Sequence, residues 1–478
     1  MPPSSTRWRP ATGSPTSTAC ARICRRGEEI STPERVLPGP DRRGAERDRR
    51  PNGGPNGGAG RNDRTGRTGL GPEPPVTDTG TRRPGNNGKK ARERAPREDD
   101  IKAVRPIAPA LAGGVLSSGL ALAGPQGVPG PGADPDCLAS RSAGTGYLQW
   151  PPREGPCRIA IVNGFVGNGW RIQMIKTANA FAQAPSIRDR IAEFKVVSTG
   201  TDAAVQLGAI EDVINQGYDA IVTIAVAPDG FDRVIRLADR NDVVLVPFEN
   251  VLDTDRVMQV NEDQLAMGRT WAGFVLDQLK AEGKTSGRIL EMRGLPGNSV
   301  DRDRSPGIGQ LLDEPGGGGQ RVSAVGNRDD GAAQKVVADA IAVHGHFDAI
   351  LAQGGTTGVV QALLASGHPM VPVAGESENG FRKLVAQHAD EGLRGISIGQ
   401  SPGLVAIAMK AAISALEGNP VPQLISVPLP VATYDQLQDG VNHWKDLPDT
   451  FFTVNECPPC GVNITGPAIV AQSEADTN

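Results

Sequence analysis

The chain has 478 residues and a formal net charge of −4, and its length allows two or three domains. Basic residues concentrate at the N-terminus, where residues 1–100 hold 21 Lys and Arg against 13 Asp and Glu. The first 146 residues contain a single aromatic, Trp8, so they cannot bury enough apolar surface to offset the entropy of ordering. We therefore expect residues 1–103 to be disordered. A basic tail without a folded reading domain does not indicate a nucleic-acid partner.

Residues 104–124 resemble a secretory signal peptide. The segment has one positive charge at Arg105, then an apolar core of small residues, and ends in Ala-Leu-Ala at 121–123. Small side chains at these positions fit a signal peptidase. This pattern predicts export to the periplasm or cell envelope, translation that starts at Val104, and a linker over residues 125–156.

Four cysteines flank the remaining chain: Cys137, Cys157, Cys457 and Cys460. In an exported protein an even number favours disulfides, and the sequence leaves three pairings open. A redox pair or half of a zinc site at 457–460 is the weaker alternative, because no second such motif is present. His344 and His346 have no third ligand in the pattern, so we predict neither a metal nor a cofactor.

From residue 157 onward, short β-branched runs alternate with stretches that have helical spacing. The apolar runs predict strands over residues 157–164, 193–200, 218–226, 242–250, 256–262, 287–294, 321–327, 347–355, 369–377 and 393–400. The intervening periodicity predicts helices over residues 170–184, 202–217, 229–241, 264–283, 305–314, 331–345, 357–367, 380–392 and 403–418. Pro306 is expected to interrupt the start of the helix at 305–314.

This alternation predicts an α/β protein with two doubly wound parallel-sheet lobes. We expect the N-terminal lobe over residues 157–261 and 401–423, the C-terminal lobe over 262–400 and 424–460, and a tail over 461–478. Hinge strands are expected at residues 259–262, 397–400 and 424–430. Ligands of such sheets bind beyond the carboxyl ends of the strands. There the stretch "MRGLPGNSVDRDRSPG", residues 292–307, places two arginines and two aspartates directly after a strand.

The chain resembles the ribose-type, sugar-binding class of periplasmic substrate-binding proteins of ABC importers. The resemblance covers residues 157–460 and rests on "GLPGNSVDRDRSPG", "DAAVQLGAIEDVINQGYDAIVTIAV", "VNEDQLAMGR", "GESENGF" and "ISIGQSPG". It implies the type I periplasmic binding protein fold, a sugar or polyol ligand, and no catalysis.

The resemblance also implies a set of ligand contacts. Trp170 and Arg171 fall where aromatic residues stack on the sugar, and indole suits an apolar sugar face. Carboxylates accept from hydroxyls, whereas arginine and amides donate to them. The predicted contacts are Asn168, Trp170, Arg171, Glu249, Arg302, Arg304, Arg328, Gln353, Glu376, Glu378 and Gln400. Arg328 replaces an aromatic residue of the family pattern, and with Arg171 it predicts a site more cationic than that of ribose binders.

We therefore predict a monomeric receptor that closes two lobes on a sugar and delivers it to an ABC permease in the membrane. A sensory protein that signals to a membrane receptor is an alternative that the sequence does not separate from transport. The effector domain of a LacI-like transcription regulator would need a helix-turn-helix, and the first 150 residues show no such pattern. Enzymatic chemistry is not predicted, because no histidine lies at a strand end.

Overall fold

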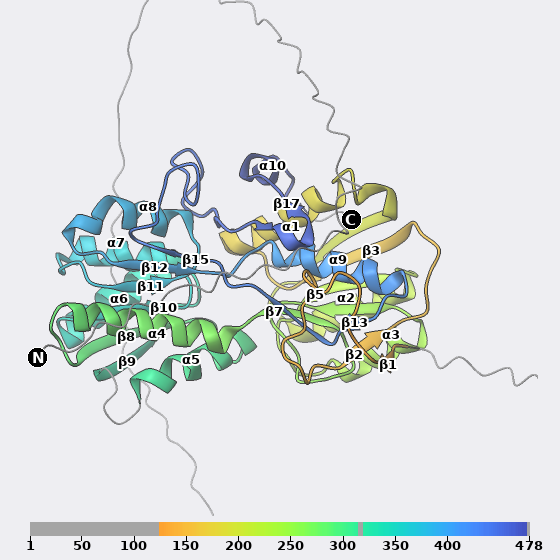
Figure 1. The fold of residues 1–478 in the computed structure, drawn as a ribbon, viewed down its shortest axis with the longest axis horizontal. Helices are drawn as coiled ribbons and strands as arrows, with labels where there is room; N and C mark the ends of the chain where they lie inside the picture. Colours follow the sequence, from red (N-terminus) through yellow and green to blue (C-terminus); the bar gives the residue numbers. More distant parts are fainter. Residues whose placement is uncertain (1–123, 314–318, 476–478) are drawn as a thin grey trace, which may run out of the picture. The chain divides into compact units, whose positions relative to one another are not determined.

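The computed structural model describes residues 124–313 and 319–475. The region expected to be disordered, residues 1–103, and nearly all of the signal-like segment lie outside the described residues. The described residues form two α/β lobes, each with its own sheet (Figure 1). Among the described residues, no helix is both long and apolar enough to cross a membrane.

The N-terminal lobe is built on a parallel sheet in the order β4-β3-β5-β6. Its strands are β3 (Cys157–Asn163), β4 (Ile191–Ser198), β5 (Ala220–Ile224) and β6 (Val244–Pro247). Its helices are α1 (Gly169–Ala182), α2 (Ala203–Asn215), α3 (Asp232–Arg240) and α9 (Leu404–Leu416). Helices α1 and α9 share one apolar cluster with the sheet, while α2 and α3 share the cluster on its other face. Because both faces are covered, β5 and β6 are buried along their whole length.

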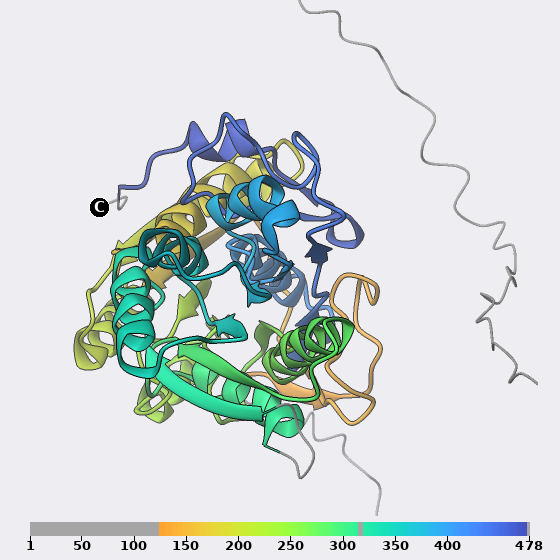
Figure 2. The same ribbon diagram turned by 90° about the vertical axis from the view of Figure 1, so that its left-hand side faces the viewer.

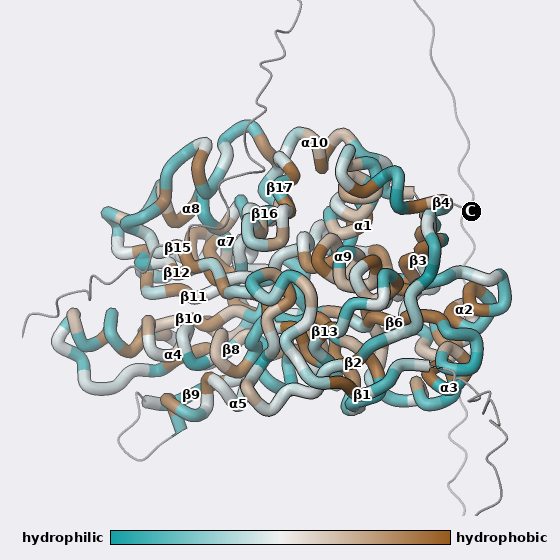
Figure 3. The backbone as a smooth tube through the Cα atoms, turned by 45° about the vertical axis from the view of Figure 1, so that its right-hand side comes forward, coloured by the Kyte–Doolittle hydropathy of each residue, from teal (hydrophilic) through white to brown (hydrophobic). Residues whose placement is uncertain are grey.

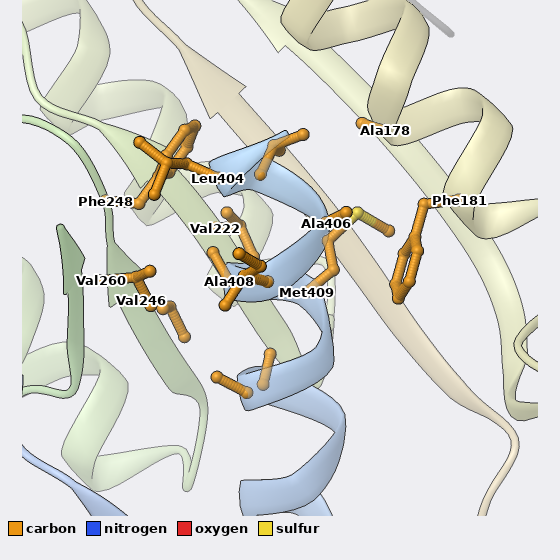
Figure 4. Close-up of a cluster of buried hydrophobic side chains, with 14 of the residues drawn as sticks. Ala178, Phe181, Val222, Val246, Phe248, Val260, Leu404, Ala406, Ala408 and Met409 are labelled. Carbon is orange, nitrogen blue, oxygen red and sulfur yellow. The ribbon is translucent and has the colours of Figure 1, made fainter. Parts of the chain in front are cut away.

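Helix α9 forms the centre of this lobe. All of its residues except Lys410 are buried, so it is apolar on every side, as a helix enclosed by protein should be. Figure 4 shows α9 between the sheet, at Val222 and Val246, and helix α1, at Ala178 and Phe181. The hydropathy colouring shows the same concentration of hydrophobic residues along α9 and its neighbouring strands (Figure 3).

The C-terminal lobe has a six-stranded sheet in the order β15-β12-β11-β10-β8-β9, and Figure 2 turns this lobe toward the viewer. Five strands are parallel, namely β8 (Gly287–Arg293), β9 (Gly319–Val325), β10 (Ala349–Ala352), β11 (Val373–Gly375) and β12 (Gly395–Ile398). The edge strand β15 (Val431–Thr433) is antiparallel. Helices α4 (Gln264–Ala281) and α5 (Ser299–Leu312) cover one face. The other face carries α6 (Asp330–His344), α7 (Thr356–Ser366) and α8 (Asn379–His388).

Helix α5 differs from the expectation, because it begins at Ser299 and continues through Pro306. The side chain of Asn298 caps it by accepting from the backbone N–H groups of Val300 and Asp301. Proline removes one backbone hydrogen bond, but close packing against α4 holds the helix in place. A Cβ atom added at Gly268 of α4 would lie 2.2 Å from the carbonyl oxygen of Arg304. The predicted interruption at Pro306 is therefore wrong.

Three connections join the sheets of the two lobes, and residues 447–455 cross between the lobes further along the chain. The first runs from β7 (Gln259–Glu262) into α4, and the second from β12 into α9. The third leaves α9 through β13 (Val421–Pro422) and β14 (Leu424–Val427) and reaches β15. Strands β7 and β14 pair in parallel, so two of the three connections lie side by side (Figure 1). Such paired crossovers are suited to hinge motion of one lobe against the other.

Segments at both ends of the described chain pack on the lobes. Residues 125–156, expected as a linker, contribute β1 (Gln126–Val128) and β2 (Tyr147–Gln149) to an antiparallel sheet with β13. The linker expectation is wrong because this segment buries Leu138 and Trp150. Cys137 forms a disulfide with Cys460, whereas Cys157 and Cys457 are free thiols. The expected tail contains α10 (Gly466–Val470), which packs against α1.

Candidate functional site

A cavity of about 260 Å³ lies between the lobes, and a second cavity of about 430 Å³ adjoins it. Both share Phe165, Asn168, Arg171, Leu295 and Arg328, so they form one ligand-sized space. These residues follow the carboxyl ends of β3, β8 and β9. This is where parallel sheets bind ligands, as the sequence led us to expect.

The N-terminal lobe supplies its wall through the first turn of α1. Asn168 caps this helix by accepting from the backbone N–H of Arg171 at 3.0 Å. Trp170 lies against the cavity and donates from Nε1 to the backbone carbonyl of Gln400 at 3.0 Å. Arg171 donates to Oδ1 of Asn163 at 2.6 Å, and burial lowers its pKa to about 10. Arg171 therefore stays protonated at neutral pH.

A chain of polar groups spans the lobes behind this wall. Arg328 donates from Nη1 to Oε1 of Glu249 at 2.7 Å, and the side-chain amide of Gln400 donates to the same oxygen at 2.8 Å. Burial alone would lower the pKa of Arg328, but Glu249 and Glu376 raise it above its ordinary value. The charge of Arg328 is thus already compensated by the protein.

Strained backbone accompanies these groups. Glu249, Arg328 and Gln400 all have positive φ angles, of 60°, 57° and 49°. A side-chain-bearing residue adopts this region at a cost, and such strain concentrates at binding sites where the surrounding structure enforces it. Here it brings side chains from three different strand ends into one network.

Arg304 lies beneath the cavity and is not part of its lining. Its side chain is 0% exposed, and its guanidinium donates to Glu376 at 2.7 Å, to Gln400 at 2.7 Å and also to Gln264. The ring of Trp271 lies 4.9 Å from its Cζ. The structure therefore gives Arg304 an interior role, in contrast to the ligand contact expected from the sequence.

Arg302 lies outside the cavity as well. Its side chain is 45% exposed and forms ion pairs with Asp253 and Asp303. Residues two apart on a helix differ by about 200° in direction, so Arg302 and Arg304 cannot face the same side of α5. The structure therefore places Arg302 on the surface and away from the cavity, although the sequence analysis expected it to contact the ligand. Asp301 instead pairs with Arg293 at the end of β8.

The carboxylates after β11 have separate partners. Glu376 lines the cavity and pairs with Arg304, while Glu378 lines it and accepts from the backbone N–H groups of Thr356 and Thr357 at 3.1 and 2.8 Å. Burial raises the pKa of Glu378 to about 8. Gln353 is fully buried behind the lining, and its Nε2 faces Oε1 of Glu291 at 3.4 Å.

Several buried polar atoms around the cavity have no protein partner. They are Oε2 of Glu249, Oδ1 of Asn250, Nε and Nη2 of Arg328, Oε1 of Gln353 and Oγ1 of Thr356. Buried donors and acceptors are normally paired, so a group of unpaired ones beside a cavity indicates a ligand that pairs them. The set contains both donors and acceptors, which matches hydroxyl groups. Within residues 124–313 and 319–475, no cluster of three metal-ligating side chains occurs.

The lining also contains residues that the sequence analysis did not select. Asp329 and Asp330 lie at the start of α6, and Thr450 and Phe452 come from the C-terminal part of the chain. The rule that ligands bind beyond the strand ends covers Asp329, which directly follows Arg328 after β9, and extending it by one residue adds Asp330. Thr450 and Phe452 carry no such signal, because their place depends on the path of a long irregular segment.

The chain has two lobes of doubly wound sheet, three crossovers between their sheets, and a polar cavity between the lobes. This is the architecture of a binding protein with a cleft. A family model for the periplasmic binding protein domain matches residues 159–420, and the chain belongs to this family.

Individual relatives agree with this assignment. The chain is 26% identical over 242 residues to the ribose import binding protein RbsB of Bacillus subtilis. This match covers 50% of this chain and 76% of the relative. It is 26% identical to a xylitol-binding protein of Mycolicibacterium smegmatis over 37% of this chain and 51% of that one. Among solved structures, an ABC transporter solute binding protein from Thermobispora bispora is 26% identical with a TM-score of 0.51, and the match covers 57% of this chain and 84% of that chain.

Proposed function

We propose that this protein captures a neutral sugar or polyol between its lobes and delivers it to an ABC permease, outside the cytoplasm and as a monomer. The observation that carries the proposal is the set of unpaired donors and acceptors around the cavity that Trp170 lines. Hydroxyl groups can satisfy both kinds of atom, and the indole can cover the apolar face of a sugar ring. The names of two relatives, which refer to ribose and xylitol, support the same ligand class.

The charge balance supports a neutral ligand over an anionic one. Arg328 is paired with Glu249, and the lining also carries Asp329, Asp330 and Glu376. An anionic ligand would meet these carboxylates in a partly buried space, where like charges repel strongly. The sequence analysis counted Arg171 and Arg328 without these carboxylates, and so it expected a more cationic site. Arg171 itself is hydrogen-bonded to the neutral side chain of Asn163.

Binding would proceed by closure of the lobes. Trp170 and Arg171 belong to the N-terminal lobe, whereas Arg328, Asp329 and Glu376 belong to the C-terminal lobe, so a ligand in the cavity contacts both. A ligand that bridges the lobes favours the closed state by its differential affinity for that state. No covalent step is part of this function.

A titration of residues 125–478 tests the proposal. We expect a pentose, a hexose or a pentitol to bind with micromolar or better affinity in calorimetry, and sugar acids and sugar phosphates to bind more weakly. Arg328→Ala should weaken binding at least about tenfold, since it removes charge-assisted hydrogen bonds worth roughly 1.5–3 kcal/mol. Lys335→Ala is the matched control, because Lys335 is an exposed cation on the neighbouring helix α6.

Stronger binding of an anionic sugar than of any neutral one would contradict the ligand class. Delivery is tested separately, by adding the purified protein and its sugar to the candidate permease in proteoliposomes and measuring ATP hydrolysis. A protein that binds sugar but leaves every such permease unstimulated would instead favour a sensory role.

A further inference from the structure

The chain continues beyond the family-matched region, and residues 447–455 run along both lobes. We call these residues the cross-lobe segment. The side-chain amide of Asn379 donates to the carbonyls of Leu447 and Pro448 at 3.1 Å each. The backbone N–H groups of Asn379 and Gly380 donate to the segment as well, at 2.7 and 2.9 Å. These bonds fix the first half of the segment to the C-terminal lobe.

The second half of the segment is also bound to the N-terminal lobe. Gln173 of α1 accepts from the backbone N–H of Phe452 at 2.7 Å and donates to its carbonyl at 2.8 Å. The same amide donates to Oδ1 of Asn455 at 2.8 Å. Phe452 at the same time forms a β-bridge with Glu378 of the C-terminal lobe. One residue therefore contacts both lobes through its backbone.

Thr450 and Phe452 of this segment line the 260 Å³ cavity. Thr450 lies directly against the start of α1, where a Cβ atom at Gly169 would be 2.7 Å from its carbonyl oxygen. Phe452 is buried, lines the cavity and belongs to the apolar cluster of the N-terminal lobe, whereas the adjacent Phe451 packs edge-to-face on Trp444 with ring centroids 6.3 Å apart. Phe451 does not line the cavity. The segment thus forms a wall that closes the cavity on this side.

From this arrangement we infer that Thr450 and Phe452 contact the ligand and restrict it to one sugar ring. Gln173 is then the positioning residue that holds the cross-lobe segment in place. The inference rests on the proposed function. A ligand that extends past one ring toward Thr450 and Phe452 would have to displace a wall hydrogen-bonded to both lobes. Gln173 does not line the cavity, so it acts through its hydrogen bonds to the backbone of Phe452 and to Asn455.

The test compares two side chains that are adjacent in sequence. Affinities for a one-ring sugar and for disaccharides containing that sugar are measured by calorimetry in the wild type, Phe452→Ala and Phe451→Ala. Phe452→Ala opens the wall, so we expect the preference for the one-ring sugar to fall about tenfold or more. Phe451→Ala removes a ring of the same size from the same segment and should leave the preference unchanged.

Thr450→Trp gives a second test that does not depend on core packing, because Thr450 is exposed. The larger side chain should narrow the cavity and weaken the one-ring sugar about tenfold or more, with an unchanged unfolding midpoint. Gln173→Ala should lower the preference in the same direction as Phe452→Ala, whereas Gln173→Glu, which keeps the acceptor for the Phe452 N–H, should lower it less.

Two outcomes separate the inference from the proposed function. If the wild type binds no sugar, the proposed function fails and the inference fails with it. If the wild type binds a one-ring sugar but Phe452→Ala and Phe451→Ala keep the same preference, or Thr450→Trp binds normally, the inference alone is overturned.

Discussion

Replacing Arg304 by methionine should destabilise the fold more than it alters ligand recognition. Arg304 is 0% exposed, and its donors are taken up by Gln264, Glu376 and Gln400. Methionine has similar length and would fill the space beside Trp271, but it removes the charge. Glu376, itself only 2% exposed, would then lose its directly paired cation and keep only the more distant attraction of Arg328.

The size of the expected loss in stability follows from the broken ion pair between Arg304 and Glu376. Breaking a buried ion pair by removing one partner costs roughly 3–5 kcal/mol, because the remaining charge is left uncompensated. Burial lowers the pKa of Arg304, and the Coulombic attraction of Glu376 counters part of this effect. Removing both charges, in Arg304→Met with Glu376→Gln, should therefore recover roughly 1–3 kcal/mol of the loss.

Urea unfolding of the two single variants and the double variant measures these energies, and calorimetry measures sugar affinity. Arg302→Met is the matched control: Arg302 lies two residues away with its pairs on the surface, so it should cost less than about 1 kcal/mol. If Arg304→Met is as stable as the wild type but no longer binds sugar, the interior role is refuted. Such a result would instead support the ligand contact that the sequence analysis expected.

Three further outcomes are expected. Burial raises the pKa of Glu262 to about 8, so its contribution to stability is complete below about pH 4.5 and is lost as the pH rises through 8. Urea unfolding at pH 6 and pH 9 should therefore show Glu262→Gln gaining stability relative to the wild type at the higher pH, by roughly 3 kcal/mol at most, and an equal difference at both pH values would contradict this. Cys137→Ala should lower the free energy of unfolding by roughly 2–5 kcal/mol, because the disulfide between Cys137 and Cys460 joins residues 323 apart in sequence. Reductant should lower the unfolding midpoint of the wild type but not that of the variant. Trp170→Phe keeps an aromatic face but loses the hydrogen bond to Gln400. It should bind sugar more weakly than the wild type and more tightly than Trp170→Ala. A Trp170→Phe variant that binds as weakly as Trp170→Ala would argue against stacking.

The sequence by itself determined the two lobes and the edge of the sheets that binds ligand. Strands such as β5 and β6 are continuous apolar runs, and the helices between them have a period of 3.6, so local pattern suffices to place them. Asn168, Trp170, Arg171 and Arg328 lie in the loops or the first helical turn after β3 and β9, which is why a strand-end rule found these lining residues.

Tertiary structure decided which charged side chains face the ligand space. Arg302 and Arg304 differ by two positions in sequence, but the helix turns one outward and the other inward, and the close approach of α4 and α5 encloses the second. Thr450 and Phe452 reach the cavity because an irregular segment is hydrogen-bonded to both lobes. Such contacts join residues hundreds of positions apart. Local periodicity carries no information about them, because they depend on the packed arrangement of whole elements.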